Sequence, residues 1–510
     1  MNITDILMKT GQRLPDKVAF YFADQGTTYQ TLQALTESFA FGLQEMGVQK
    51  GDRVAVFTPS SLEFIISWFA AVKLGAIVVP VNIMLKARES RYILENAQVS
   101  TLIVHQSQVE MIDSLCQGLP FLKNLVVIGK QPAAGSRLFA DLLSPKPSRE
   151  MTTDCTPDDT ATMIYTSGTT GFPKGAMITH ANFYSNVQGI IEALFLDEKM
   201  VRVSVTPLFH AMGLTVSMLA VVLLGATAVI QAKLDFAEFL KANEKYRATM
   251  VSGAPALHYM LANDPRTEKY DLSSWKVATS GSAPLPVELM RKFEKKFKIP
   301  MVEAYGLTEV TTAATANPVF GIRKPGSVGL PLPGLEVKIF DDQGREVPCG
   351  EVGEIVIRGP AVMKGYYNNP EATGETLRGG WLHTGDLGKV DEDGYFYILD
   401  RKKDMIICGG YNVYPREVEE LLHTHPAVLE AAVIGIPDPK RGESPMAFVI
   451  LKPGQKGSEG ELIQFCKENL AAYKVIKAVR FMEEFPRNPN RKVLKRELRE
   501  MVSPISESKG

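Results

Sequence analysis

Apolar helical stretches alternate with short β-branched runs through the first part of the chain. Residues 60–74 (SSLEFIISWFAAVKL) have the pattern of a buried helix, and the strand-like run IVVPVN at 77–82 follows soon after. Similar runs occur at 102–105 (LIVH) and 125–129 (LVVIG), each after a helical stretch. Helices and strands that alternate in this way form layers in which helices cover mostly parallel sheets. The sequence therefore predicts an α/β architecture for this part of the protein.

The pattern changes at about residue 325. Short alternating runs such as GEIVIRG, separated by the turns DDQG, EVG and DEDG, predict an antiparallel β subdomain over about 325–400. After it, a helix, two strands and a second helix predict a small α+β unit, joined to the rest by the charged segment DRKKD. We expect an N-terminal domain with two parallel-type α/β subdomains and the antiparallel β subdomain (1–400), a hinge (401–403) and a small mobile C-terminal domain (404–510).

The overall composition argues against several classes of protein. The chain has 510 residues, too many for one compact domain, and its 56 basic and 57 acidic residues leave a net charge of −1. This balance gives no electrostatic footprint for nucleic acid. The five cysteines are scattered without a CxxC pair, which favours a reduced, cytoplasmic protein. No signal-peptide core is present, and Val216–Ile230 is shorter than the ~20 residues of a membrane span, so we expect a buried helix–turn–strand there.

Residues 165–175 (YTSGTTGFPKG) have the composition of a phosphate-binding loop. Their glycines, hydroxyl side chains and Lys174 offer backbone N–H groups, hydrogen-bond donors and a positive charge within a short stretch. The GxxxxGK[ST] spacing of the Walker P-loop is absent because Gly175 follows the lysine. Composition alone leaves a flexible glycine-rich loop as an equal alternative.

Five segments together resemble the adenylate-forming superfamily, which comprises acyl-CoA synthetases, adenylation domains of peptide synthetases and luciferases. The segments are YTSGTTGFPKG (165–175), EAYGLTE (303–309), WLHTGD (381–386), DRKKDMIICGGYN (400–412) and FPRNPNRKV (485–493). They occur in the order of the family, and the sequence looks most similar to fatty acyl-CoA ligases. The resemblance implies ATP, Mg²⁺ and coenzyme A as cofactors and co-substrates.

A nucleotide site built from most of these segments is what the resemblance implies. The loop 166–171 would wrap the β- and γ-phosphates, and Glu309 would hold Mg²⁺. Tyr305 would stack on adenine, and Asp386 would accept hydrogen bonds from the ribose hydroxyls, with Arg401 helping from across the junction. The full set of implied ATP and AMP contacts is Thr166, Ser167, Gly168, Thr169, Thr170, Gly171, Lys174, Ser282, Ala283, Glu303, Ala304, Tyr305, Gly306, Asp386 and Arg401.

The resemblance also implies a catalytic lysine that lies far from the phosphate loop in the sequence. In relatives a lysine placed like Lys492 contacts the carboxylate and the α-phosphate, and here Arg491 stands where the family usually has glycine. Thr308 would lie beside the α-phosphate, and His210 at the mouth of the acyl site. The implied catalytic residues are Lys492, Thr308, Glu309 and His210.

Family resemblance further implies a rotation of the C-terminal domain about Lys403 between two half-reactions. The rotation would withdraw the catalytic lysine and bring a glycine-rich loop to the thiol, since glycines allow close approach of a pantetheine arm. Ile407 stands where some relatives have a lysine. Lys233 resembles a basic residue that meets the nucleotide end of coenzyme A. The implied coenzyme A contacts are Lys233, Gly409, Gly410 and Tyr411.

These roles imply an ATP-dependent acid–CoA ligase. It would convert a carboxylic acid and ATP into an acyl-adenylate and pyrophosphate, and then transfer the acyl group to coenzyme A with release of AMP. Small residues fall where relatives line the acyl pocket, which favours a medium- or long-chain fatty acid. These residues are Ser252, Gly253, Ala254, Pro255, Gly281, Gly306, Thr311 and Thr312.

Alternatives remain for both the acid and the thiol. An aryl acid such as a cinnamate or benzoate, and loading of a carrier-protein phosphopantetheine, stay open. A non-catalytic nucleotide-binding protein of the same fold is disfavoured, because Lys174, Glu309, Asp386 and Lys492 occur together. The expected partners are the acid, ATP and coenzyme A, without nucleic acid or a transmembrane segment. Peripheral membrane association and homo-oligomerisation stay open.

Overall fold

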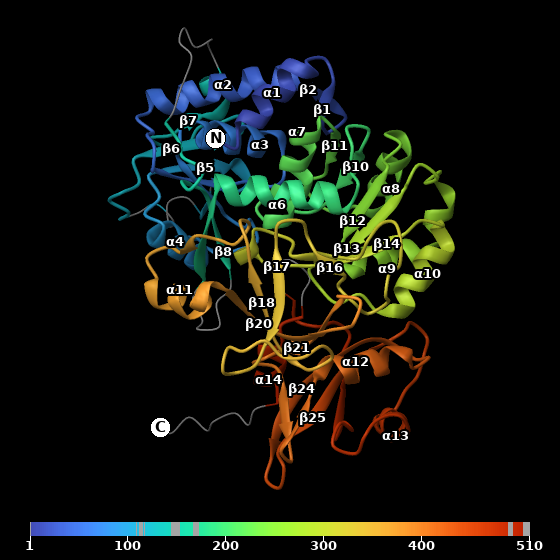
Figure 1. The fold of residues 1–510 in the computed structure, drawn as a ribbon. Helices are drawn as coiled ribbons and strands as arrows, with labels where there is room; N and C mark the ends of the chain where they lie inside the picture. The colour runs from blue at the N-terminus through green and yellow to red at the C-terminus, as the bar shows by residue number, and fades with distance from the viewer. Residues whose placement is uncertain are drawn as a thin grey trace.

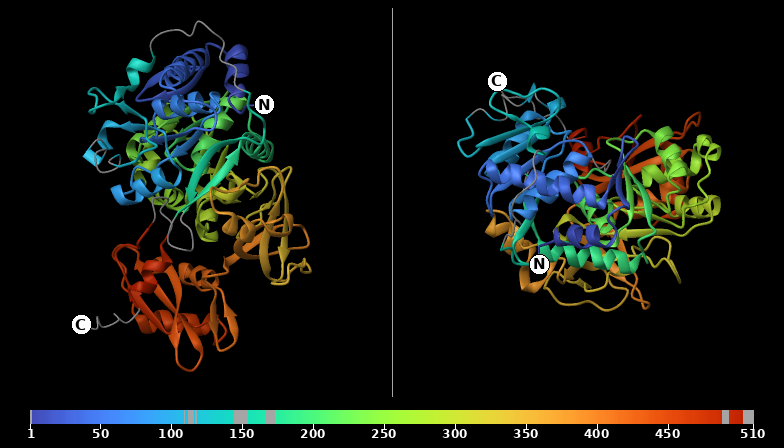
Figure 2. Two further views of the ribbon diagram at one scale, coloured as in Figure 1. Left: turned by 90° about the vertical axis from the view of Figure 1, so that its left-hand side faces the viewer. Right: turned by 90° about the horizontal axis from the view of Figure 1, so that it is seen from above.

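A large α/β body carries a smaller C-terminal unit at one end. The structure is a computed structural model that describes residues 2–108, 110–111, 116, 118–143, 154–166, 173–487 and 493–502. The C-terminal unit, orange to red, lies below the body in Figure 1 and is joined to it through the yellow antiparallel sheet. The side view in Figure 2 shows the same separation.

Within the described residues, the first sheet of the body has eight strands, and the six from β8 to the edge strand β7 are parallel. Neighbouring strands from β8 to β7 pair in parallel, while β9 and β19 add antiparallel strands beyond β8. In spatial order the strands are β19 (Gly365–Tyr366), β9 (Lys174–Thr179), β8 (Thr160–Thr166), β4 (Ile77–Pro80), β3 (Arg53–Phe57), β5 (Thr101–His105), β6 (Asn124–Ile128) and β7 (Arg137–Leu138).

The second sheet has nine strands and is parallel from β14 to β1. Strands β15 and β16 at one end and β2 at the other pair in the antiparallel sense. In spatial order the strands are β16 (Leu330–Pro331), β15 (Thr315–Ala316), β14 (Met301–Tyr305), β13 (Val277–Ser280), β12 (Met250–Gly253), β10 (Val201–Ser204), β11 (Thr227–Ile230), β1 (Val18–Phe22) and β2 (Gln25–Thr28).

One apolar core joins the two sheets, and helix α3 lies within it. Ser61 caps this helix by accepting the N–H of Phe64, and the fully buried Trp68 donates to Thr162 Oγ1 at 3.0 Å. Residues 64–72 of the helix are all buried, and all but Ser67 are apolar, as expected for a helix covered on every side. The helices of the body are α1 (Asp5–Arg13), α2 (Tyr29–Glu45), α3 (Leu62–Lys73), α4 (Ala87–Asn96), α6 (His180–Ala193), α7 (Ala220–Leu224), α8 (Phe236–Lys245), α9 (Pro255–Asn263), α10 (Val287–Phe297) and α11 (Pro370–Thr376).

The apolar run Val216–Ile230 folds as the sequence predicts. A buried π-helical segment, Gly213–Leu219, continues into α7, and Gly225 ends the helix with φ +76° before β11 begins. Within the described part of the chain, no helix has the length and apolar character needed to cross a membrane.

An antiparallel sheet and the C-terminal unit complete the fold. Strands β17 (Glu336–Phe340), β18 (Gly353–Arg358), β20 (Leu382–Val390) and β21 (Phe396–Arg401) form the sheet. The unit beyond it contains β22 (Ile406–Cys408), β23 (Tyr411–Val413), β24 (Val428–Asp438), β25 (Gly442–Leu451), β26 (Ala478–Phe481), α12 (Pro415–Thr424), α13 (Glu459–Asn469) and α14 (Lys495–Glu500). The predicted fold class, with two parallel-type α/β sheets, an antiparallel sheet and a small α+β unit, is confirmed.

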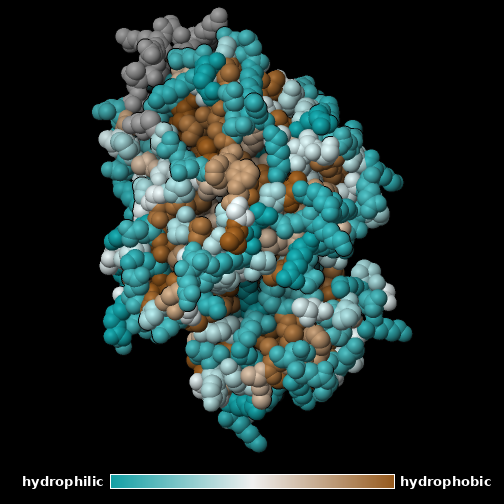
Figure 3. Space-filling view, turned by 45° about the vertical axis from the view of Figure 1, so that its right-hand side comes forward, coloured by the Kyte–Doolittle hydropathy of each residue, from teal (hydrophilic) through white to brown (hydrophobic). Residues whose placement is uncertain are grey.

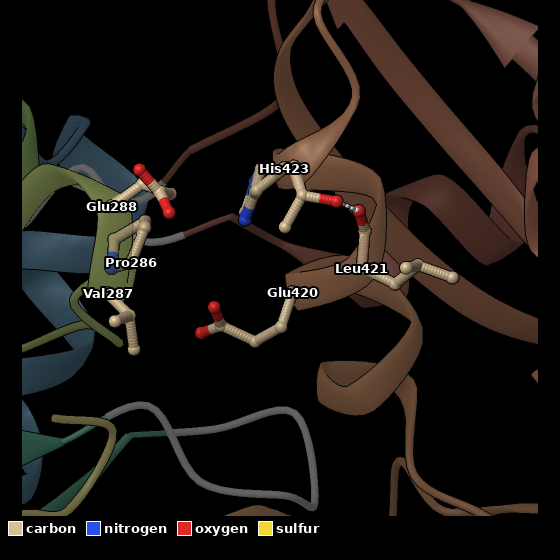
Figure 4. Close-up of a pocket in the computed structure, with 7 residues that line it drawn as sticks. Pro286, Val287, Glu288, Glu420, Leu421 and His423 are labelled. Atoms are coloured by element: carbon tan, nitrogen blue, oxygen red, sulfur yellow. Dashed lines mark hydrogen bonds between the residues drawn. The ribbon is translucent and has the colours of Figure 1, made fainter. Parts of the chain in front are cut away.

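Helix α12 of the C-terminal unit faces the body across a cleft of about 340 Å³. Figure 4 shows His423 and Glu420 of α12 pointing toward residues at the start of α10, and Figure 3 shows the surface hollowed between the two parts. The residues that line the cleft are Pro286, Val287, Glu288, Glu420, Leu421, His423 and Thr424.

Arg416 in the first turn of α12 crosses this junction. Its backbone N–H donates to Asp400 Oδ2 at 2.9 Å, and its Nη1 donates to the carbonyl of Ile398 at 2.9 Å. Its Nη2 lies 3.8 Å from Glu303 Oε1 on β14. Burial raises the pKa of Glu303 to about 7, although Arg416 and a hydrogen bond from the backbone N–H of Leu285 favour the charged carboxylate. The junction therefore contains a carboxyl group that titrates near neutral pH.

We expect the Glu303→Gln variant to gain thermal stability relative to the wild type as pH rises from about 4.5 to 7. The folded-state pKa of Glu303 is raised, so its contribution to stability is complete below its unfolded pKa and is lost as pH rises through about 7. Neutral glutamine removes this dependence. The gap between the two unfolding midpoints should widen by on the order of 3 °C, measured by differential scanning calorimetry at each pH.

Glu288→Gln is the matched control, because Glu288 lines the same cleft but is exposed. Its midpoint should follow the wild type at every pH. A constant gap between Glu303→Gln and the wild type would contradict the assignment of the neutral titration to Glu303.

Candidate active site

Two of the predicted site segments begin at the carboxyl ends of neighbouring parallel strands. In the second sheet, Gly253 at the end of β12 pairs with Ser280 of β13, and Ser280 pairs with Glu303 of β14. The segment 280–284 (SGSAP) follows β13, and 303–309 (EAYGLTE) runs off the end of β14. In open α/β sheets this edge is where ligands bind.

Tyr305, Asp386 and Arg401 lie together, as the sequence predicts. Tyr305 Oη donates a hydrogen bond to Asp386 Oδ2 at 2.7 Å, and Arg401 Nε lies 3.5 Å from Asp386 Oδ1. Asp386 and Arg401 are directly opposite each other on β20 and β21. Burial and the Asp386 carboxylate hold the pKa of Tyr305 well above its ordinary value, so the phenol remains a donor at neutral pH.

Glu309 lies between the two sheets of the body. Its Oε1 accepts a hydrogen bond from Tyr366 Oη at 2.7 Å and from Thr166 Oγ1 at 3.5 Å. Lys174 Nζ lies 5.3 Å from the centre of the Tyr366 ring, where a cation interacts favourably with the π-face. Thr308 precedes Glu309 in the short 3₁₀ helix Thr308–Val310. These contacts bring Glu309, the candidate magnesium ligand, next to the end of β8 and the start of β9.

The carboxylate of Glu309 suits a magnesium ion that is shared with a substrate. Mg²⁺ prefers oxygen ligands and is usually held by one or two carboxylates plus phosphates and water. No group of three His, Cys, Asp or Glu residues among those described could hold a metal ion by itself. Bound there, the ion would neutralise phosphate charge.

The loop that follows Gly306 is tightly held. A Cβ on Gly306 would lie 1.9 Å from the carbonyl oxygen of Thr312, so only glycine fits there. Asn186 of α6 donates to the carbonyl of Ala313 at 2.7 Å. Thr311 adopts φ +70° and donates to the carbonyl of Ala361 at 2.7 Å. These bonds fix the backbone of the loop around Thr311 and Thr312, two residues that the sequence predicts to line the acyl pocket.

The Glu303 side chain contacts both the segment that follows β13 and the C-terminal unit. Glu303 Oε1 accepts the backbone N–H of Leu285 at 3.1 Å and faces Arg416 at 3.8 Å. The carboxylate therefore connects the 280–284 segment with the C-terminal unit. Ser282 is exposed with φ +69°, and the half-buried Ala283 and Ala304 complete this rim.

His210 lies in the turn that leads into the π-helical segment. Its backbone N–H donates to the carbonyl of Pro207 at 3.1 Å, and its carbonyl accepts the N–H of Leu214 at 2.9 Å. Its ring is 5.0 Å from that of Phe209. Thr215, in the π-helical segment, shares a 2.8 Å hydroxyl contact with Thr312. This contact connects the segment that follows His210 with the loop that follows Gly306.

The predicted coenzyme A contacts are exposed. Gly409 and Gly410 have φ of +60° and +82°, and a Cβ on either would meet open space. Tyr411 is 61% exposed and stacks on Tyr473, with ring centres 4.8 Å apart. Lys233 is also exposed. Within the described residues, no hydrogen bond or ion pair connects Lys233 or Tyr411 with Asp386.

Several predicted residues fall outside the described part of the chain. These are Ser167, Gly168, Thr169, Thr170, Gly171 and Lys492. The flanking Thr166 and Lys174 are placed, and both contribute to the Glu309 cluster. Lys403 is exposed in the short link between β21 and β22.

Three further residues of the site carry no signal in the local sequence. Tyr366 reaches Glu309 from 57 positions away, and Arg416 reaches Glu303 only through the packing of α12. Glu354 accepts the backbone N–H of Gly385 at 2.9 Å, directly before Asp386. Only the three-dimensional fold reveals these partners.

Two family models match the chain. The model described as AMP-binding enzyme covers residues 7–367, and that described as AMP-binding enzyme C-terminal domain covers residues 417–492. A long-chain-fatty-acid–CoA ligase of Bacillus subtilis is 40% identical over 526 residues, spanning 98% of this chain and 94% of the relative. A feruloyl-CoA synthase of an Amycolatopsis species is 37% identical over 486 residues, spanning 95% and 96%.

Solved structures agree over nearly the whole chain. The anthranilate CoA ligase AuaEII in complex with anthranoyl-AMP superposes with a TM-score of 0.92 at 33% identity, covering 98% of this chain and 97% of that one. ATP-bound MatB from Rhodopseudomonas palustris superposes with a TM-score of 0.91 at 33% identity, covering 98% and 99%. Matches to the family models over most of the chain, and to sequence relatives and solved structures over nearly all of it, show that the chain belongs to the AMP-binding enzyme family.

Proposed function

We propose that the protein is an ATP-dependent acid–CoA ligase that acts on medium- or long-chain fatty acids. The observation that carries this proposal is the 40% identity, over 98% of the chain, to a relative named as a long-chain-fatty-acid–CoA ligase. The clusters around Asp386 and Glu309 support it, because a carboxylate suited to ribose hydroxyls and a carboxylate suited to Mg²⁺ both lie near the end of β14.

In the first half-reaction a carboxylate oxygen of the acid attacks the α-phosphorus of ATP. The new bond gives the acyl-adenylate, and the bond to the β-phosphate breaks to release pyrophosphate. Both reactants are anionic, so catalysis depends on positioning and charge neutralisation. Asp386 would orient the ribose, Glu309 would hold Mg²⁺ to neutralise phosphate charge, and Lys174 would contact the phosphates. The predicted place of Lys492 is between the carboxylate and the α-phosphate.

In the second half-reaction the sulfur of coenzyme A attacks the acyl carbon and AMP leaves. The open backbone at Gly409 and Gly410 suits the passage of a pantetheine arm. These residues and Lys492 both belong to the C-terminal unit, so the two steps call for two orientations of that unit. The short link at 402–405 is the natural pivot.

The chemical class of the acid and the cellular location of the enzyme complete the proposal. The small side chains at the ends of β12 and β13 favour an extended acyl chain as the group bound there. An aryl acid is the second candidate, favoured by the match to a feruloyl-CoA synthase. No disulfide joins the five cysteines, all of which the structure describes, and this supports a cytoplasmic location.

With ATP, Mg²⁺ and coenzyme A, fatty acids of medium or long chain should yield equimolar AMP and acyl-CoA. The test measures AMP, pyrophosphate and thioester by liquid chromatography across saturated acids of increasing length, ferulate and benzoate. Asp386→Asn should lower kcat/KM for ATP by roughly 10- to 100-fold, because a charge-assisted hydrogen bond to the ribose is lost. ADP and phosphate as products would rule out the proposal. A preference for ferulate would show that the enzyme acts on aryl acids instead of fatty acids.

Lys403→Pro should separate the two half-reactions. Proline fixes φ near −65°, so it restricts rotation at the link. We expect the variant to release about one equivalent of pyrophosphate per enzyme in rapid-quench experiments, while thioester formation falls by about 10²-fold.

Lys403→Ala keeps the backbone free and serves as the control, with both half-reactions near wild-type rates. Wild-type thioester formation by folded Lys403→Pro would refute rotation at this residue. It would leave the roles of Asp386 and Glu309 intact.

A further inference from the structure

Glu354 on β18 is a buried carboxylate that lies outside the five motif segments of the sequence but within the range of the AMP-binding enzyme model. It is 7% exposed, within the antiparallel sheet. A buried charge is costly unless charged or polar partners surround it. Its partners therefore indicate why a carboxylate stands at this position.

The strand opposite Glu354 is irregular, and the irregularity contains the ribose-binding turn. Glu354 pairs with Leu387 and Val356 pairs with His383, so residues 384–386 of β20 stand opposite the single residue between them on β18. A bulge of this kind re-aims side chains and leaves backbone groups without ladder partners. Here it turns Asp386 toward Tyr305.

The Glu354 carboxylate replaces the hydrogen-bond acceptor that the backbone N–H of Gly385 loses at the bulge. Its Oε1 accepts the backbone N–H of Gly385 at 2.9 Å. Its Oε2 lies 3.1 Å from His383 Nδ1 and 3.3 Å from Arg378 Nη2. Lys402 Nζ is 4.0 Å away. The Glu354 carboxylate thus contacts three segments: the turn at Gly385, the 3₁₀ segment that contains Arg378, and the link to the C-terminal unit at Lys402.

Gly385 is also held at its carbonyl, by the link to the C-terminal unit. Its carbonyl accepts the backbone N–H of Lys402 at 2.8 Å, and its φ is +71°. Thr384 Oγ1 donates to the carbonyl of Ile355 at 2.7 Å and accepts the N–H of Asp386 at 3.1 Å. The orientation of Asp386 is therefore set jointly by β18 and by the segment about which the C-terminal unit would turn.

We propose that Glu354 is a positioning residue for the nucleotide: through the Gly385 peptide it aims the Asp386 carboxylate at the ribose hydroxyls. This inference rests on the proposed function only for the identity of the nucleotide site, not for the acid. Removing Glu354 leaves the Gly385 N–H without its acceptor and frees the turn, so recognition of the ribose weakens while contacts to base and phosphates persist.

The test compares binding of ATP and of 2′,3′-dideoxy-ATP by isothermal titration calorimetry, with Mg²⁺ and without acid. Wild type should prefer ATP because Asp386 reads the hydroxyls that the analogue lacks. Glu354→Ala should weaken ATP binding by roughly 10- to 100-fold and leave the analogue almost unchanged, so the preference collapses. Glu354→Gln keeps an oxygen that accepts the Gly385 N–H and should restore most of the preference.

Two further variants keep the test decisive if Glu354→Ala folds poorly. Gly385→Ala strains the same peptide without a steric contact, since a Cβ there meets nothing within 4 Å, and should also lower the preference. Glu336→Ala removes an exposed carboxylate from the same sheet and should change neither affinity.

Equal weakening of ATP and dideoxy-ATP in Glu354→Ala would overturn the proposal, because general damage to the site affects both ligands. An unchanged preference in Glu354→Ala or in Gly385→Ala would overturn it as well. Wild-type protein that binds ATP with the ribose preference but activates no acid would refute the proposed function and leave this inference standing.

Discussion

The hydrogen bond between Tyr305 and Asp386 connects the parallel body to the antiparallel sheet. The two residues are 81 positions apart, and both are nearly buried, so separating them would leave a desolvated phenol and carboxylate. The bond fixes β20 against the end of β14 and, through the pairing of Asp386 with Arg401, also fixes β21 and the link that follows it. The proposed ribose site therefore requires that the two sheets be docked.

The same strand also determines how the C-terminal unit meets the body. Glu303 and Tyr305 are two positions apart on β14 and therefore project to the same side. Tyr305 faces the antiparallel sheet, while Glu303 faces Arg416 of α12 across an ion pair of 3.8 Å beside an open cleft. The cleft beside this ion pair supports the proposal that the unit changes orientation between two chemical steps.

Sequence patterns predicted the layers well because local periodicity determines helices and strands. The helix–turn–strand at Val216–Ile230 is an example, where Gly225 ends the helix. The predicted cluster of Tyr305, Asp386 and Arg401 rests on family motifs, and the structure brings these residues together. The roles of Tyr366, Arg416 and Glu354 depend on contacts between distant strands and helices, which no local spacing encodes. The sequence likewise did not reveal that the Glu303 side chain contacts Leu285 and Arg416.

Acid-dependent exchange of pyrophosphate into ATP, measured without coenzyme A, tests the central claim most directly. Exchange requires that the acyl-adenylate form reversibly in a site that needs no thiol. The account predicts rapid incorporation of labelled pyrophosphate with a medium- or long-chain fatty acid and Mg²⁺, and none without the acid. Exchange that occurs without any acid, or that starts only when coenzyme A is added, would contradict adenylate formation as the first step.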